Sequence, residues 1–150
     1  MAADAWVLHD KAKEYLGDGT IDLDNDTFKM ALFLSTSNIA TTTIDALATA
    51  TNEHSNANGY TTGGETLTSV TWTEASAGVM RFDCDNVVWT ASGGSITARF
   101  AGIYDDTVSS PVADPILCHS LLDNAPADVQ ATDGNTYTVS INASGVFTLT

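Results

Sequence analysis

Three aspartates stand at alternate positions in the segment IDLDNDTF, which runs from Ile21 to Phe28. Alternating carboxylates are typical of calcium loops, but an EF-hand loop needs glycine at its sixth position and a bidentate glutamate at its twelfth. Counted from Asp22, these positions hold Thr27 and Phe33. Because Asp and Asn also form turns through local hydrogen bonds, we interpret the run from Asp22 to Asp26 as a polar turn before a strand, with calcium binding as the alternative.

A second acidic pair, Asp105-Asp106, directly follows a predicted strand and precedes the sequence TVSSP. Paired carboxylates can serve acid–base or metal chemistry. Aspartates at the end of a strand, however, are also typical turn residues. We therefore interpret this pair as part of a turn.

The remaining residue types that could carry chemistry do not form a recognisable motif. The histidines, His9, His54 and His119, lack the paired spacing of a zinc site, so we expect each to be an isolated side chain. No G-x-S-x-G nucleophile elbow occurs, and the glycine pairs at 63–64 and 93–94 lack the other residues of a phosphate loop. The sequence predicts no catalytic residue, no metal site, no cofactor and no enzymatic activity.

Aromatic residues offer one further binding chemistry, because exposed rings can form a platform for sugars. The candidates are Trp6, Trp72, Trp89, Tyr60, Tyr104 and Tyr137. Trp72 and Trp89 alternate with other residues inside predicted strands, which favours packing in the core or at an interface. A glycan-binding platform remains the alternative.

The charge composition limits the possible partners. The chain has 19 acidic residues and five basic ones, a net charge of −14, and no basic stripe that could neutralise phosphates. Direct binding to nucleic acid or to an anionic membrane is therefore not expected. Charged residues make up 16%, against about 25% in typical domains, so a surface rich in Thr, Ser and Asn either contacts other subunits or is a neutral β surface.

No targeting segment is apparent. The start MAADAWVLHD lacks the basic and apolar regions of a signal peptide, and no apolar run approaches the ~18 residues of a membrane span. We expect the chain to remain soluble in the cytoplasm in which it is made. Cys84 and Cys118 are then expected to be reduced, buried thiols, with a disulfide as the alternative.

Alternating apolar residues predict strands along most of the chain, while helix signals are few. The predicted strands cover 28–34, 70–73, 80–85, 87–90, 96–104, 116–122, 136–141 and 147–150. Turns at 92–95 and 142–145 predict two hairpins, the second closing the chain. Asp10 as N-cap and Gly17 as C′ residue predict a short helix, and a second short helix is expected over 43–50.

This pattern predicts an all-β fold, an antiparallel β-sandwich or flattened barrel of the jelly-roll kind with one or two short helices. At 150 residues the chain fits a single domain, 1–150. We expect an extended N-terminal segment over about 1–10 and a long exposed loop over about 52–65, both with few internal contacts.

Three segments also carry a family resemblance: IDLDNDTFKMALFLSTS, NGYTTGGETLTSVTW and VVWTASGGSITARFAGIYDDT. Together they resemble small structural proteins of tailed bacteriophages, most closely capsid decoration (cement) proteins. The likeness extends from about Lys11 to Asp106 and more loosely through the strand near Ile116 and the last two predicted strands. None of these motifs is catalytic.

The resemblance implies a virion protein on the capsid exterior, assembled in the cytoplasm of a bacterial host. Its partners would be the major capsid protein and other copies of the chain, as a trimer around a local three-fold axis. Segments 1–10 and 52–65 would reach neighbouring subunits. The alternatives are a tail or head-tail connector subunit and a receptor- or glycan-binding module displayed on the particle.

Overall fold

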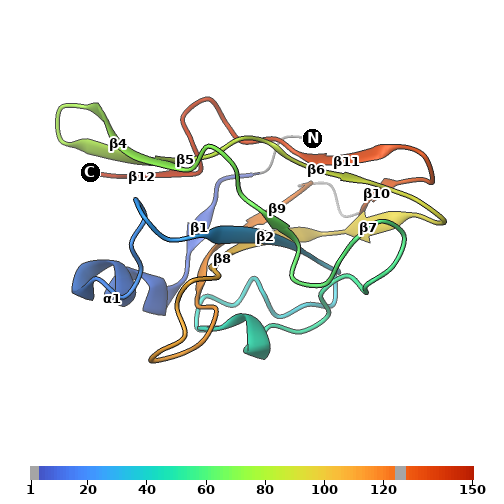
Figure 1. The fold of residues 1–150 in the computed structure, drawn as a ribbon, viewed down its shortest axis with the longest axis horizontal. Helices are drawn as coiled ribbons and strands as arrows, with labels where there is room; N and C mark the ends of the chain where they lie inside the picture. The colour runs from blue at the N-terminus through green and yellow to red at the C-terminus, as the bar shows by residue number, and fades with distance from the viewer. Residues whose placement is uncertain (1–3, 124–127) are drawn as a thin grey trace.

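The computed structural model describes residues 4–123 and 128–150, and these form antiparallel sheets with one α-helix, as expected for an all-β sandwich-like fold (Figure 1). The largest sheet has five strands in the order β1-β9-β8-β2-β3. Its strands are β1 (Val7–Leu8), β2 (Phe28–Phe33), β3 (Glu65–Thr66), β8 (Phe100–Asp105) and β9 (Ile116–Leu121).

A second layer lies above this sheet in the view of Figure 1. It contains the three-stranded sheet β12-β5-β4 and the pair β11-β6, and the pair β10-β7 continues it toward the five-stranded sheet. The strands are β4 (Thr71–Ser76), β5 (Val79–Asp83), β6 (Val87–Thr90), β7 (Ile96–Ala98), β10 (Val129–Ala131), β11 (Thr136–Val139) and β12 (Phe147–Leu149).

Two hydrophobic clusters lie on opposite faces of β2. Phe28, Met30 and Leu32 belong to the main core, together with Phe82 and Trp89 of the second layer. Ala31 and Phe33 of β2 belong to a smaller cluster on the other face, which Ile39 and Leu47 of the segment 34–50 cover. A strand buried on both faces reads as a continuous apolar run, and the sequence of β2, FKMALF, fits this pattern from Met30 to Phe33.

The predicted long strand over 96–104 is wrong, because the chain breaks at Arg99. β7 ends at Ala98 and pairs with β10, whereas β8 starts at Phe100 and pairs with β2 and β9. At the break, the backbone N–H of Arg99 donates to the carbonyl of Phe33, and the Arg99 carbonyl accepts from Leu122. Strand conformation was correctly predicted for 96–98 and 100–104, but the bend and the change of sheet at Arg99 were not.

Both predicted hairpins are also wrong. β6 pairs with β11 and β7 pairs with β10, so the segments 87–98 and 129–139 form one long antiparallel ribbon interrupted by the turns at 91–95 and 132–135. Near the end of the chain, β11 and β12 do not pair with each other: β11 pairs with β6, and β12 pairs with β5. Local turn signals were present, but the strands that flank them have distant partners.

Helix α1 (Asp10–Asp18) is confirmed with shifted ends. His9 is the N-cap residue in place of Asp10, and the left-handed residue at the C-terminus is Gly19 (φ 80°) in place of Gly17. Over 43–50 the structure has only the 3₁₀ turn η1 (Leu47–Thr49). Within 4–123 and 128–150, no helix is both long and apolar enough to cross a bilayer.

The segments expected to have few internal contacts are anchored. Residues 1–3 lie outside the described part of the chain, but Val7 and Leu8 form β1 and pair with β9. In the segment 52–65 most side chains are exposed, yet His54 and Tyr60 are buried. The Tyr60 hydroxyl accepts from the backbone N–H of Leu32 (3.0 Å) and donates to Glu53 (2.6 Å). These contacts hold the segment against β2.

Cys84 and Cys118 are free and buried, as expected for structural thiols. Cys118 lies in β9 and Cys84 directly follows β5, and both belong to the main core. Burial raises the pKa of the Cys84 thiol to about 12, which keeps it protonated and unreactive at neutral pH.

Gly64 has a position that no other residue can take without rearrangement. Its φ is +73°, and a Cβ there would lie 1.8 Å from the carbonyl oxygen of Met30 in β2. We expect Gly64→Ala to lower the free energy of unfolding by about 3 kcal/mol or more, from left-handed strain and overpacking combined. Urea denaturation measures this change.

Gly17→Ala is the matched control. Gly17 lies in α1 and is exposed, and outside the backbone of its own helix a Cβ at this position would meet no atom within 4 Å. Alanine should raise the free energy of unfolding by about 0.5–1 kcal/mol, because it has the higher helix propensity. Equal effects of the two substitutions would contradict the close packing of Gly64 on β2.

Candidate functional site

The structure brings together the two acidic runs of the sequence. β2 and β8 are antiparallel with Phe28 opposite Asp105, so the turn that precedes β2 lies beside the end of β8. As a result, the carboxyl group of Asp26 comes within hydrogen-bonding reach of the carboxyl group of Asp105. We call Asp26 and Asp105 the carboxyl pair.

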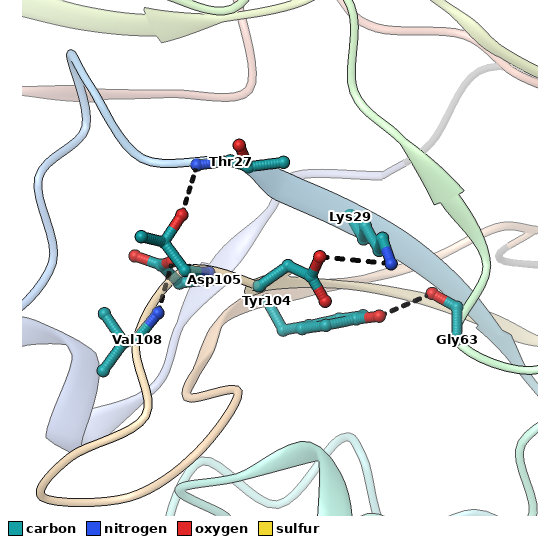
Figure 2. Close-up of polar contacts among 8 residues, drawn as sticks. Thr27, Lys29, Gly63, Tyr104, Asp105 and Val108 are labelled. Carbon is teal, nitrogen blue, oxygen red and sulfur yellow. Dashed lines mark hydrogen bonds and ion pairs between the residues drawn. The ribbon is translucent and has the colours of Figure 1, made fainter.

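Asp105 is 0% exposed, and its two carboxyl oxygens have different surroundings. Oδ1 accepts hydrogen bonds from the backbone N–H groups of Thr107 (2.9 Å) and Val108 (3.3 Å), whereas Oδ2 is buried and has no donor among the described residues. The backbone of Thr27 donates to the Thr107 hydroxyl (2.8 Å), on the same side of the strand end as Asp105 (Figure 2). The turn and the strand end are thus joined by several hydrogen bonds around one buried acid.

The surroundings change the acidity of Asp105. Burial raises its pKa to about 7, and the nearby Asp26 carboxyl acts in the same direction, while the N–H groups of Thr107 and Val108 partly oppose the change. A carboxyl with a pKa near neutrality is a common feature of acid–base sites. Here, however, the group is fully buried, so a substrate would have no access to it.

The neighbouring acid, Asp106, has an ordinary partner. Its Oδ2 lies 3.1 Å from Lys29 Nζ in a half-exposed ion pair, and the adjacent Tyr104 donates its hydroxyl to the carbonyl of Gly63 (2.7 Å). Figure 2 shows these contacts on the other side of the strand end from Asp105 and Thr27. The two consecutive acids therefore have opposite roles, one paired with a base and one with another acid.

The remainder of the first acidic run forms a turn, which confirms that interpretation. The carboxylate of Asp22 accepts from the backbone N–H groups of Asp24 (3.0 Å) and Asn25 (3.2 Å) and from the Asn25 side chain (2.8 Å). These donors lower the pKa of Asp22. In the part of the chain that the structure describes, no three His, Cys, Asp or Glu residues gather as metal ligands.

The expectation that each histidine is isolated is wrong for His9 and His119. His9 Nε2 lies 2.9 Å from His119 Nδ1, and His9 Nδ1 lies 2.6 Å from the carbonyl oxygen of Ile44. The pair connects the N-cap of α1, strand β9 and the segment 34–50. Because 110 residues separate the two histidines, their spacing along the chain offers no indication of contact.

The hydrogen bonds determine which nitrogens carry protons. A carbonyl only accepts, so His9 Nδ1 must be protonated, and in the neutral ring Nε2 is then the acceptor for His119 Nδ1–H. Burial lowers the pKa of both rings, and for His119 burial and the proximity of His9 together lower the pKa to about 4. The pair is therefore neutral at pH 7 and serves as a buried structural contact.

Four of the six aromatic candidates, Tyr60, Tyr104, Trp89 and Tyr137, are buried. Trp6 and Trp72 are partly exposed. Trp72 borders a hollow of about 300 Å³, whose other lining residues include Leu16, Asp22 and Leu149. Trp6 borders another hollow, of about 490 Å³, whose other lining residues include Asp4 and Asn142. Core packing is thus confirmed for most of the aromatics, and the two partly exposed tryptophans each line a surface hollow.

Comparisons with models of protein families, with curated proteins and with solved structures found no match to this chain.

The histidine pair predicts acid sensitivity. In the folded protein the pKa of His119 is about 4, below its value of about 6.5 in the unfolded chain, so between these values the unfolded chain binds more protons. The free energy of unfolding should therefore fall as the pH decreases from about 6.5 to 4, by up to about 1.4 kcal/mol per pH unit for each histidine. In urea denaturation, His119→Asn should reduce this pH dependence, because the amide can still donate to His9 but does not titrate.

His119→Phe provides the comparison. Phenylalanine retains a ring but leaves His9 Nε2 without its donor, so the protein should lose about 1–3 kcal/mol even at pH 8. An unchanged pH dependence in His119→Asn would show that the pair does not cause the acid sensitivity.

Proposed function

We propose that this chain is a non-enzymatic structural protein of a tailed bacteriophage particle, a decoration protein that binds the capsid exterior and stabilises contacts between major capsid subunits. The resemblance of its sequence to such proteins motivates the proposal. The observation that carries it is the exposed edge of the three-stranded sheet, formed by β4.

Strand β4 has the properties of a surface that another subunit covers. Among its six residues only Glu74 is charged, and Thr71, Thr73, Ala75 and Ser76 are exposed. Edge strands of soluble proteins are usually protected by Lys, Pro, bulges or short length. β4 contains no Lys or Pro, and its bulge lies at one end, between Glu74 and Ser76. The regular part, 71–74, is therefore unprotected and open to a partner.

The buried chemistry also supports a structural role. Three of the four groups in the carboxyl pair and the histidine pair, His9, Asp105 and His119, are buried, and Asp26 is partly buried. Each pair joins segments that are far apart in the sequence. Their contribution is to the folded scaffold, and the acidic exterior would steer docking onto a basic surface of the capsid more than determine its strength.

For the glycan-binding alternative, the hollow beside Trp72 is one candidate site. A sugar site usually combines an aromatic ring with free polar groups that fix orientation. Asp22 lines this hollow, but its carboxylate already accepts three hydrogen bonds from its own turn. Glycan-array binding that Trp72→Ala abolishes would favour this alternative.

Particles provide the direct test. Heads that lack the protein should break at a lower temperature than complete heads. They should also break sooner as the ionic strength is reduced, and purified protein should restore their stability. Thr71→Lys places a charge on the edge of β4, opposite Asp83, where it is compatible with the fold. At equal concentration, this variant should protect at least about tenfold fewer heads than the original protein does, as measured by DNA release on heating.

Thr43→Lys is the matched control, because Thr43 is exposed in the segment 34–50, to which the proposal assigns no contact, and the change in charge is the same. It should restore stability as the original protein does. Heads without the protein that tolerate heat and low ionic strength as well as complete heads would refute the stabilising role, and equal effects of the two variants would exclude β4 as the docking edge.

The isolated protein should form trimers. Sedimentation velocity or mass photometry at micromolar concentration distinguishes them from the rings or tubes expected of a connector or tail subunit. A chain that stays monomeric and does not bind heads would contradict the proposal.

A further inference from the structure

The carboxyl pair lies where two loops of the five-stranded sheet meet. Asp26 belongs to the turn before β2, and Asp105 is the last residue of β8. Backbone contacts surround the pair: Asp106 N–H donates to the Thr27 carbonyl (2.8 Å), and Asp105 N–H donates to the Pro115 carbonyl (3.0 Å). A change at the pair therefore acts on the turn at 22–27 and on the segment that leads into β9.

The carboxyl pair needs a hydrogen atom to satisfy its buried oxygen. Oδ2 of Asp105 has no donor among the described residues, and Asp26 offers a second carboxyl group within hydrogen-bonding reach. Two ionised carboxylates in this position would repel each other, and neither could donate. One proton held between them removes a charge and creates the missing hydrogen bond.

A proton fits this position better than a metal ion. Calcium requires six to eight oxygen ligands, and magnesium requires an octahedral set. The pair supplies two carboxyl groups, Oδ1 of Asp105 is already engaged with backbone N–H groups, and Oδ2 of Asp26 accepts from Asp22 N–H (2.7 Å). No third acidic, histidine or cysteine ligand joins them within the described ranges.

The charged groups around the pair leave the repulsion uncompensated. From β2, Lys29 points to Asp106, with which it forms an ion pair at 3.1 Å. Asp114, in the segment between β8 and β9, adds a further acid near Asp106, and its pKa is raised by burial and by that neighbour. Lys29 is thus engaged with Asp106, and no basic group is among the main influences on the pKa of Asp105.

We propose that Asp26 and Asp105 share one proton and form a pH-sensitive clasp that fastens the turn at 22–27 to the end of β8. The clasp is closed in the protonated form and weakened when the proton is lost. This inference concerns regulation of the scaffold and does not depend on the proposed role in a virion.

The direction of the effect follows from proton binding. The pKa of Asp105 is about 7 in the folded protein and about 3.8 when the group is free, so between these values the folded protein binds the additional proton. The contribution of the clasp to the free energy of unfolding is greatest below pH 3.8, the pKa of the free group, and is lost as the pH rises toward 7. The histidine pair acts in the opposite direction over much of this range, so the two must be separated by variants.

Asp105→Asn separates them, because the amide can accept from Thr107 and Val108 and donate to Asp26 without a proton. Between about pH 5 and 6.5, the unfolding constant of the original protein, relative to that of Asp105→Asn, should rise by about tenfold per pH unit. Urea denaturation across this range measures the ratio. A pH titration of the side-chain carboxyl carbon of Asp105 by NMR should give a midpoint near neutrality.

Asp26→Asn supplies the same donor from the other side and should also remove the extra pH dependence, which covers the case in which Asp105→Asn fails to fold. Asp24 is an exposed residue of the same turn. Asp24→Asn removes one charge and should leave the extra pH dependence unchanged. The proposal is overturned if the ratio is constant with pH in both pair variants, or if Asp105 titrates near 4. Stabilisation of the original protein by calcium at pH 8 that both pair variants abolish would also overturn it, in favour of a cation site.

Discussion

The structure depends on strand β8, which is buried on both faces and has a partner on each side. β2 and β9 pair with it along nearly its whole length, and the main core and the smaller cluster lie on opposite faces of these strands. Such a strand must be apolar and narrow, and Ala101-Gly102 meets this need. A Cβ on Gly102 would lie 3.0 Å from the ring of Phe33, so the glycine permits the close approach of the smaller cluster.

Local conformation was largely predictable from the sequence, whereas strand partners were not. The alternation in 28–34 correctly predicted β2, and the apolar run in 116–122 correctly predicted β9, a strand with five of its six residues buried. The apolar pattern continues on both sides of Arg99, so it gave no indication of the bend at which the chain changes sheets. Both hairpins failed for a related reason: the turns exist, but more distant segments supply the pairing partners.

The carboxyl pair and the histidine pair show the same limit for side-chain chemistry. Each member was visible as a residue type, and the turn formed by Asp22 was predictable because its hydrogen bonds are local. The contact between Asp26 and Asp105 follows from a single fact, that Phe28 lies opposite Asp105, and the contact between His9 and His119 follows from the pairing of β1 with β9. Strand register is set by packing across the whole sheet, so neither contact could be read from spacing along the chain.

The break at Arg99 has a mechanical consequence. Through its backbone this residue is bonded to Phe33 and Leu122 in the neighbourhood of the five-stranded sheet, and its guanidinium contacts Asp128 at the start of the β10 ribbon (3.0 Å). The covalent chain itself passes from one layer to the other at this point. A sideways load on either layer is therefore carried by peptide bonds as well as by packing, and the layers cannot slide past each other without extending the chain at Arg99.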